Sequence, residues 1–197
     1  MSNIFGNEVP ATPDGADSSP YTLGTRFRVT TPGKISHIRW RVPVTSQAEG
    51  IHIALFDEDW TALGFRRGIS TSGTEGTWAE FALTAPISVV TNRLYTAAVY
   101  TPNRYPATNA YPWPKTSSDG YLVTDAPIAG FYNGSWDLAY PTDSYQYTSY
   151  FVDVRFTADS VTPAGPTVSV WNGTAEVAAS TRVWTGSAEI AGSIAIA

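Results

Sequence analysis

Residues 35–44 read Ile-Ser-His-Ile-Arg-Trp-Arg-Val-Pro-Val, and this stretch decides the fold. The apolar side chains of Ile38, Trp40 and Val42 alternate with polar or basic residues at positions 37, 39 and 41. A period of two is expected for a β-strand that has one buried and one polar face. No window of the chain carries the sustained 3.6-residue period of a helix with its caps. The stretch therefore predicts a strand whose apolar face lies in a core.

The same pattern continues on both sides of this stretch. Residues 23–29 also alternate, with Leu23, Phe27 and Val29 on the apolar face, and Pro32-Gly33 makes the turn between the two strands. Further strands are expected at 51–56, 63–69, 78–83, 87–90, 94–100, 121–123, 128–132 and 150–156. Short strands spaced by turn residues are typical of sandwiches. We therefore predict an all-β fold, a jelly-roll-like antiparallel β-sandwich followed by short C-terminal β-hairpin repeats.

Three local details extend this prediction. Residues 51–56 are apolar on both faces, so this strand is expected to be covered on both sides. In the last strand of the sandwich, Phe151, Asp153 and Arg155 are expected to face outward. Asn133-Gly134 predicts a tight hairpin turn, because this dipeptide readily adopts the positive φ angles of such turns.

Proline and glycine divide the chain into four parts. Residues 1–20 carry three prolines and predict an extended N-terminal arm that tethers the domain or lies along it. Residues 21–157 form the β-sandwich domain. Residues 158–166 predict a Pro/Gly linker, and residues 167–197 form the hairpin repeat segment.

The C-terminal segment contains one motif twice. Residues 170–177 read Val-Trp-Asn-Gly-Thr-Ala-Glu-Val, and residues 183–190 read Val-Trp-Thr-Gly-Ser-Ala-Glu-Ile. Each copy predicts a β-hairpin, with Asn172-Gly173 as the turn of the first. Because an isolated hairpin is marginal in water, we expect an assembly interface formed by Val170, Trp171, Val183 and Trp184. The partner would be other copies of the chain, for example in a trimer; the alternative is a small local core.

Composition excludes several classes of function. The formal charge is −5 and no Lys/Arg cluster occurs, so a nucleic-acid partner is not expected. The absence of cysteine excludes disulfides, thiolate nucleophiles and Cys-based zinc sites. The first residues lack the pattern of a signal peptide and no window is apolar enough to span a membrane. We therefore expect synthesis in the cytoplasm and no membrane partner.

Catalytic residues are hard to assemble from this sequence. His37 and His52 are the only histidines, both lie in strand patterns, and no Gly-x-Ser-x-Gly elbow occurs. Asp57, Glu58 and Asp59 are interpreted as a strand-end turn, with a calcium site as the alternative. We therefore predict a protein that is not an enzyme, with no catalytic residue, no cofactor and no metal site.

Aromatic residues provide a stronger indication of binding. They crowd the segment with the longest loops, and exposed rings on a sandwich can stack against sugar faces. A cell-wall glycan such as arabinogalactan would be a suitable ligand, with Trp113 the ring expected to be most exposed. The alternative is that these rings pack the loops onto the sandwich. The candidate glycan-binding residues are Tyr105, Tyr111, Trp113, Tyr132, Trp136 and Tyr140.

Landmarks along residues 4–157 resemble a domain family of unknown function. That family occurs beside catalytic modules in secreted bacterial glycan-processing proteins and in some phage structural proteins. The resemblance implies an all-β fold and transfers no catalytic residue. It rests on Ile4-Phe5-Gly6, Leu23-Gly24, Arg26-Phe27, Ile38-Arg39-Trp40, Ile51 through Phe56, Gly76 to Phe81, Ala85-Pro86-Ile87, Tyr95 and Tyr150 to Phe156.

The C-terminal motif resembles the Val-Trp-Asn-Gly repeats of minor tail proteins from phages that infect actinobacteria, although Glu176 and Glu189 stand where those repeats often carry a second Trp. The resemblance implies a virion structural protein, a minor tail or tail-fibre-like component with other virion proteins as partners and host-glycan contact. A capsid decoration protein is the first alternative, and a carbohydrate-binding module of a bacterial enzyme system is the second.

Overall fold

The structure, a computed structural model, describes residues 1–17, 19–45, 50–160, 167–171 and 176–180. The chain divides into two compact units, Met1–Asp159 and Ser160–Ala197. The first unit contains both the segment 1–20 and the sandwich. Its last strand ends at Ala158, next to the position where the sequence predicts the linker. The described residues contain no helix, and hence none that could cross a membrane.

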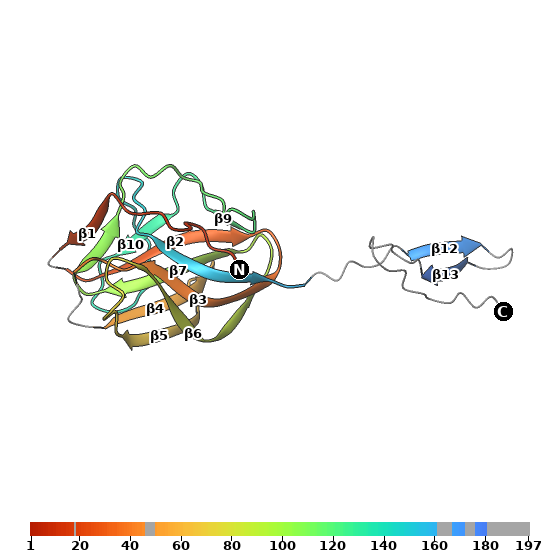
Figure 1. The fold of residues 1–197 in the computed structure, drawn as a ribbon, viewed down its shortest axis with the longest axis horizontal. Helices are drawn as coiled ribbons and strands as arrows, with labels where there is room; N and C mark the ends of the chain where they lie inside the picture. Colours follow the sequence, from red (N-terminus) through yellow and green to blue (C-terminus); the bar gives the residue numbers. More distant parts are fainter. Residues whose placement is uncertain (18, 46–49, 161–166, 172–175, 181–197) are drawn as a thin grey trace. The chain divides into compact units, whose positions relative to one another are not determined.

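The first unit contains a large antiparallel sheet (Figure 1). Its strands run in the order β10-β2-β7-β4-β5, and β9 pairs with the other end of β2. The strands are β2 (Tyr21–Val29), β4 (Ile51–Asp57), β5 (Ala62–Ile69), β7 (Leu94–Thr101), β9 (Leu122–Thr124) and β10 (Gly130–Asn133).

A second antiparallel sheet has the order β11-β3-β6 and packs against the large one. It consists of β3 (Gly33–Arg41), β6 (Trp78–Val89) and β11 (Val152–Ala158). Consecutive strands cross between the two sheets, from β2 to β3 to β4 and from β5 to β6 to β7. A short ribbon of β1 (Thr12–Ala16) and β8 (Arg104–Ala107) lies beside them. The predicted all-β antiparallel sandwich is confirmed.

The core lies between the two sheets and is built from the predicted apolar faces. Ile38 and Trp40 of β3 are fully buried, as are Leu23 and Phe27 of β2. The central strand β4 is buried on both faces, as expected from its continuous apolar run. Its outer face lies under the segment that follows β10, where Leu138 and Tyr140 pack on Phe56. By contrast, the edge strand β5 is largely exposed.

The N-terminal segment is an integral part of the sandwich unit. Ser2 forms an antiparallel bridge with Phe156 of β11, and the Phe5 side chain is only 2% exposed. Phe5 packs against Trp78 and Phe151 with ring centroids 6.0 and 5.4 Å apart. Residues 1–20 therefore do not project from the sandwich: the first part covers the outer face of the small sheet, and Thr12–Ala16 adds a strand.

A buried ion pair holds this N-terminal segment in place. The fully buried Asp153 of β11 contacts Arg39 of β3 at 2.9 Å. It also accepts hydrogen bonds from the backbone N–H groups of Ile4 and Phe5, at 2.8 and 3.1 Å. Burial raises the pKa of the Asp153 carboxyl, whereas Arg39 and the N–H donors oppose that shift by stabilising the ionised form. Asp153 and Phe151 lie on the outer face as predicted, but the N-terminal segment covers them.

Two predictions about turns and strands are wrong. Asn133-Gly134 does not form a two-residue hairpin, because Tyr132 pairs with Asp143 and neither turn residue has a positive φ angle. A longer loop between Tyr132 and Asp143 is favoured because its side chains cover the outer face of β4. The strands expected at 78–83 and 87–90 form one strand, β6, with a register shift opposite Ile35 and His37.

The second unit contains one described hairpin, β12 (Thr167–Trp171) and β13 (Glu176–Ser180). Val170 pairs with Val177 and Trp171 with Glu176, whereas a two-residue turn at Asn172-Gly173 would place Trp171 opposite Thr174. The Asn172-Gly173 turn and the second copy with Val183 and Trp184 lie outside the described residues.

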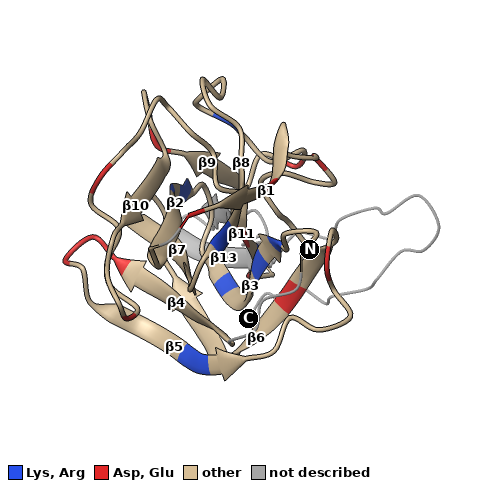
Figure 2. Cartoon of the chain, turned by 90° about the vertical axis from the view of Figure 1, so that its left-hand side faces the viewer, with Lys and Arg blue, Asp and Glu red and all other residues tan. Residues whose placement is uncertain are grey.

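Charged residues are scattered over the sandwich. Figure 2 shows Lys and Arg positions on several strands, including β3 and β5. On the small sheet, acidic residues pair with these basic ones. Arg39 contacts both Asp153 and Glu80, and Arg155 also contacts Glu80, at 2.9 Å. These pairs neutralise much of the surface charge around the small sheet.

Candidate binding pocket of the sandwich

Four tyrosines form a closed ring, here called the tyrosine box. The box consists of Tyr21, Tyr105, Tyr150 and Tyr132, and each ring contacts the next edge-to-face. The centroid distances around the ring are 5.9, 6.1, 6.4 and 5.9 Å. Edge-to-face contacts at these distances are favourable for aromatic rings. Two of the predicted glycan-binding residues, Tyr105 and Tyr132, belong to this box.

The tyrosine box lines a cavity of about 300 Å³, at the lower end of the range of about 300–1,000 Å³ for small-molecule sites. Tyr150 and Leu23 are buried and form its deep part, whereas Tyr145 is 53% exposed and stands at the mouth. The other three box tyrosines are half-buried. The complete lining is Asp17, Tyr21, Leu23, Tyr105, Tyr132, Tyr145 and Tyr150.

Several strands bring these residues together. Tyr21 and Leu23 lie at the start of β2, where β10 pairs antiparallel and places Tyr132 opposite Leu23. Tyr105 lies on β8, directly across from Gly15 of β1. The remaining tyrosines come from the segment that leads into β11. The pocket therefore lies at one end of the sandwich, between its large sheet and the β1–β8 ribbon.

Two glycines make this arrangement sterically feasible. A Cβ atom on Gly15 would lie 2.8 Å from the ring of Tyr105, closer than real Cβ contacts allow. A Cβ atom on Gly130 of β10 would collide with the backbone carbonyl of Thr148. Glycine at these positions lets the Tyr105 ring lie across β1 and lets the segment before Tyr150 pass close to β10.

The segment that carries Tyr145 and Tyr150 has a strained backbone. Gln146, Tyr147 and Phe151 have φ angles of 45°, 55° and 53°, in the left-handed region that non-glycine residues rarely adopt. Hydrogen bonds hold the segment: Ala110 and Tyr111 donate their N–H groups to the carbonyls of Gln146 and Tyr147, at 2.8 and 3.1 Å. Such strain costs about 1–3 kcal/mol per residue and clusters at ligand sites in proteins.

The electrostatics of the pocket are set by one carboxylate and neutral phenols. The Tyr21 hydroxyl donates a hydrogen bond of 2.7 Å to Asp17, and this bond, together with burial, raises the pKa of Tyr21 to about 12. Burial also raises the pKa of Tyr105 and of Tyr150. The phenols therefore remain neutral at physiological pH, and Asp17 is the charged residue of the lining.

Two other predicted glycan-binding residues lie in a different cluster. Tyr111 is buried, and Trp113 is half-buried rather than exposed. Both rings pack edge-on against Phe5, at 5.9 and 6.0 Å. The Trp113 indole also donates a hydrogen bond of 3.1 Å to the carbonyl of Tyr147. These two rings pack against the N-terminal segment, which supplies apolar surface that covers them.

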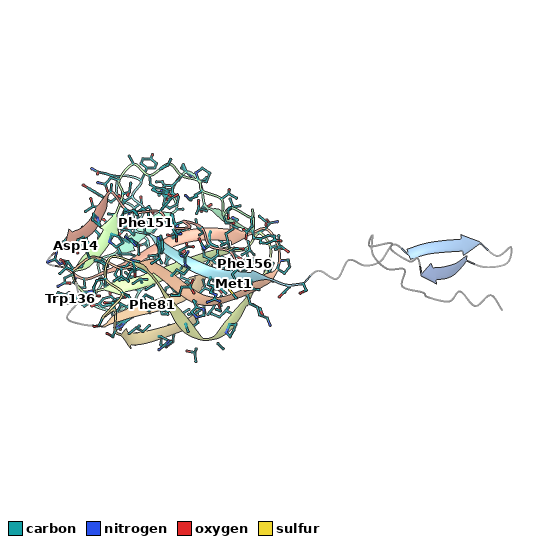
Figure 3. All side chains as sticks on the ribbon, viewed as in Figure 1. Met1, Asp14, Phe81, Trp136, Phe151 and Phe156 are labelled. Atoms are coloured by element: carbon teal, nitrogen blue, oxygen red, sulfur yellow. The ribbon has the colours of Figure 1, made fainter. Side chains whose placement is uncertain are left out.

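The last two predicted residues lie outside the pocket: Tyr140 packs on the outer face of the large sheet, and Trp136 is exposed. Tyr140 stacks on Trp60 with centroids 5.2 Å apart and hydrogen bonds to Thr96. Trp136 lies at the periphery of the sandwich and is 85% exposed (Figure 3). The six predicted residues are therefore divided among three places, and only Tyr105 and Tyr132 line the pocket.

The histidines lie on different sheets. His37 is on β3, where burial and the nearby Arg155 lower its pKa. His52 on β4 stacks on Tyr100 at 4.8 Å and accepts a hydrogen bond from the N–H of Gly68. The described residues contain no group of three or more His, Asp or Glu side chains suited to a metal ion.

The acidic turn after β4 has a cationic partner. Arg93 contacts Asp57, Glu58 and Asp59 at 3.2, 3.3 and 3.4 Å. Asp57 also accepts the backbone N–H of Thr61 and thus closes the turn. The arrangement agrees with the strand-end interpretation of this triplet.

Sequence reasoning missed Asp17, Tyr21, Tyr145 and Tyr150 as pocket residues. The sequence does signal Tyr21 and Tyr150, since Tyr21 begins β2 and Tyr150 lies just before β11, and side chains next to loops can line an end of the sandwich. The pairing of β10 with β2 and of β1 with β8 was needed to show that they meet.

The fold and its pocket define the class of this chain: a β-sandwich domain with a ligand-sized aromatic cavity at one end. Residues 7–152 match the profile of a domain of unknown function, DUF4082. This match covers well over half of the chain, and the protein belongs to that family. No curated protein matches the sequence.

Proposed function

We propose that this protein is a non-enzymatic binding component whose sandwich domain holds one unit of a surface glycan in the tyrosine box. The observation that carries this proposal is the closed ring of four tyrosines around a cavity of about 300 Å³. Tyrosine faces bury the C–H surfaces of a sugar ring, while phenolic hydroxyls pair with sugar hydroxyls. A cavity at the lower end of the small-molecule range suits a single ring or substituent.

The charge pattern of the pocket favours binding over hydrolysis. Glycoside hydrolysis ordinarily uses two carboxyl groups about 5–9 Å apart on either side of the scissile bond. Asp17 is the single carboxylate among the lining residues, and it is hydrogen-bonded to Tyr21. The pocket therefore lacks the second carboxyl of that mechanism within its lining.

The glycan proposal is tested by titrating the protein with cell-wall polysaccharide fragments in a calorimeter. We expect Tyr132→Ala to weaken binding by about tenfold, because an aromatic contact contributes about 0.5–1.5 kcal/mol beyond the area that it buries. Trp136→Ala is the matched control, since this ring is exposed and outside the pocket. Equal losses in both variants, or no saturable binding by any fragment, would contradict the proposal.

We further propose that the second unit attaches the protein to a phage particle, as a minor tail or tail-fibre-like component. The supporting observation is that the described part of Ser160–Ala197 is a two-stranded hairpin, and such a ribbon is marginal without a partner surface. Capsid decoration and a role as a carbohydrate-binding module of a bacterial enzyme system are the alternatives. Each could use the same pocket.

The attachment proposal predicts the effect of removing residues 160–197. The remaining unit contains its own core, so we expect it to stay folded and to become monomeric, whereas the full chain forms an oligomer. Light scattering coupled to size-exclusion chromatography measures both. A monomeric full chain that does not bind purified particles would exclude the proposal. A label on this protein, located on purified particles, would show whether it lies on the tail or on the capsid.

A further inference from the structure

We infer that the tyrosine box receives a quaternary ammonium group, such as the trimethylammonium head of choline, carried by the ligand. The inference rests on the proposed function only in taking the box as a ligand site, and it names the chemical group that the box selects. Three features of the described pocket lead to it: the geometry of the rings, the sign of the charge and the chemistry of the deep end.

The first feature is the geometry of the rings. Neighbouring rings of the box stand at 84°, 75°, 67° and 77° to one another, as the walls of a box do. A cation enclosed by such walls lies near several π faces at once, and attraction to the faces grows when water is excluded. Aromatic cages of this kind are the usual binding sites for quaternary ammonium ions in proteins.

The second feature is the sign of the charge. Asp17 is the charged member of the lining, at the mouth of the box beside the Tyr21 hydroxyl. Arg104, which neighbours Tyr105 on β8, is engaged by Asp14 at 3.2 Å. Arg26 of β2 lies over the ring of Phe131, 3.5 Å from its centroid, and is not part of the lining. With Asp17 as its charged residue, the lining favours cationic over carboxylated or sulfated ligands.

The third feature is the chemistry of the deep end. Leu23 and the buried ring of Tyr150 offer apolar contact there. A primary ammonium carries N–H donors that would lose water without full replacement, whereas a quaternary ammonium has no N–H to satisfy. Its methyl groups instead gain by leaving water. The box should therefore prefer methylated over unmethylated ammonium ions.

Size supports the same occupant. The cavity of about 300 Å³ is small for a drug-sized molecule and has space for a compact group together with water. Tyr145 at the mouth is exposed and leaves a path for the rest of a larger ligand. A head group can thus enter the box while the molecule that bears it remains outside.

The experiment titrates the full chain with choline chloride, with ethanolamine and with 3,3-dimethylbutan-1-ol, the uncharged carbon analogue of choline. Binding is followed by calorimetry and by the NMR signals of ring-labelled tyrosine. We expect choline to bind about tenfold or more tightly than the uncharged analogue, since a desolvated cation–π contact contributes about 2 kcal/mol, which corresponds to more than tenfold. We expect choline also to bind more tightly than ethanolamine, because the N–H donors of a primary ammonium would lose water in the box without full replacement.

Variants separate ring attraction from simple apolar burial. Tyr132→Phe keeps the aromatic face and should retain choline affinity within about threefold, whereas Tyr132→Leu should lose about tenfold. Asp17→Asn should weaken choline binding while leaving the analogue unchanged, and Trp136→Ala, outside the pocket, should have no effect. Thermal unfolding curves confirm that each variant is folded, and Tyr105→Phe with Tyr105→Leu provides a second pair.

Each outcome decides the inference. Equal affinity for choline and its carbon analogue, or equal losses in Tyr132→Phe and Tyr132→Leu, would overturn it. Binding of neutral sugar fragments without choline binding would overturn it and leave the proposed function intact. Choline binding without any glycan binding would support it and remove the glycan proposal. Comparison of free choline with a phosphocholine-bearing polysaccharide identifies the source of the group.

Discussion

Replacing Asp153 by alanine is expected to destabilise the sandwich by about 3–5 kcal/mol, because removing one partner of a buried ion pair leaves the other charge without compensation. Arg39 is the partner that remains, and its guanidinium lies under the N-terminal segment, donating to the carbonyl of Gly6 at 3.3 Å. The backbone N–H groups of Ile4 and Phe5 would lose their acceptor as well. Chemical denaturation measures the free energy of unfolding.

The matched control for this change is Glu80→Gln. Glu80 contacts the same Arg39 at 3.3 Å from the other side, but its side chain is partly exposed. Exposed ion pairs contribute about 0–1 kcal/mol, so the control should lose less than about 1 kcal/mol. If Asp153→Ala does not fold, Asp153→Asn keeps an acceptor oxygen for the backbone donors and should give a measurable intermediate loss. Equal effects at the two acidic positions would show that burial of Asp153 is not what matters.

The second large effect is expected for Phe5→Ala, with a loss of about 3–5 kcal/mol in the free energy of unfolding. The Phe5 ring fills a space bounded by Trp78, Tyr111 and Phe151, so its removal leaves a cavity in the outer core. Val9→Ala, at a residue that is 66% exposed on the same segment, should change stability by no more than about 0.5 kcal/mol. Thermal and urea unfolding of both variants measure this difference.

A small effect of Phe5→Ala would mean that the N-terminal segment is dispensable for the fold. The effects of Phe5→Ala and Asp153→Ala should also not add, because both residues hold the same segment. The double variant should therefore lose less than the sum of the two single losses, and full additivity would show that the two contacts act independently.

The N-terminal segment is connected to the pocket through one ring contact and one backbone hydrogen bond. Phe5 packs on Tyr111, and Tyr111 donates its N–H to the carbonyl of Tyr147, in the strained segment between Tyr145 and Tyr150. The aromatic cluster around Phe5 thus supports the loop that carries two residues of the pocket lining. This connection explains how a residue outside the pocket helps to hold its shape.

The strands could be predicted well from sequence because their signal is local. In β2 and β3 the apolar residues recur every second position, and each such residue must leave water whichever partner strand covers it. The burial of Leu23, Phe27, Ile38 and Trp40 follows from that alternation alone. The turn at Asn133-Gly134 was predicted from equally local information and is wrong, because covering the outer face of β4 favours a longer excursion.

The burial of Phe5 could not be predicted from the composition of its neighbourhood. Prolines and polar residues follow it and indicate an extended arm, and Thr12–Ala16 of the segment is a strand. What draws the segment onto the sheet is Asp153, near the other end of the domain, whose carboxylate binds two backbone N–H groups of the N-terminus. Such a long-range polar contact has no periodic signal in sequence.

The sequence by itself determined that this chain is an all-β sandwich and which faces of its central strands are buried, because alternation of apolar and polar residues is a property of neighbouring positions. Only the tertiary structure decided which aromatic residues meet. Tyr21, Tyr105, Tyr132 and Tyr150 come from four separate segments, and strand pairing across the domain, with Gly15 and Gly130 allowing close approach, brings their rings around one cavity.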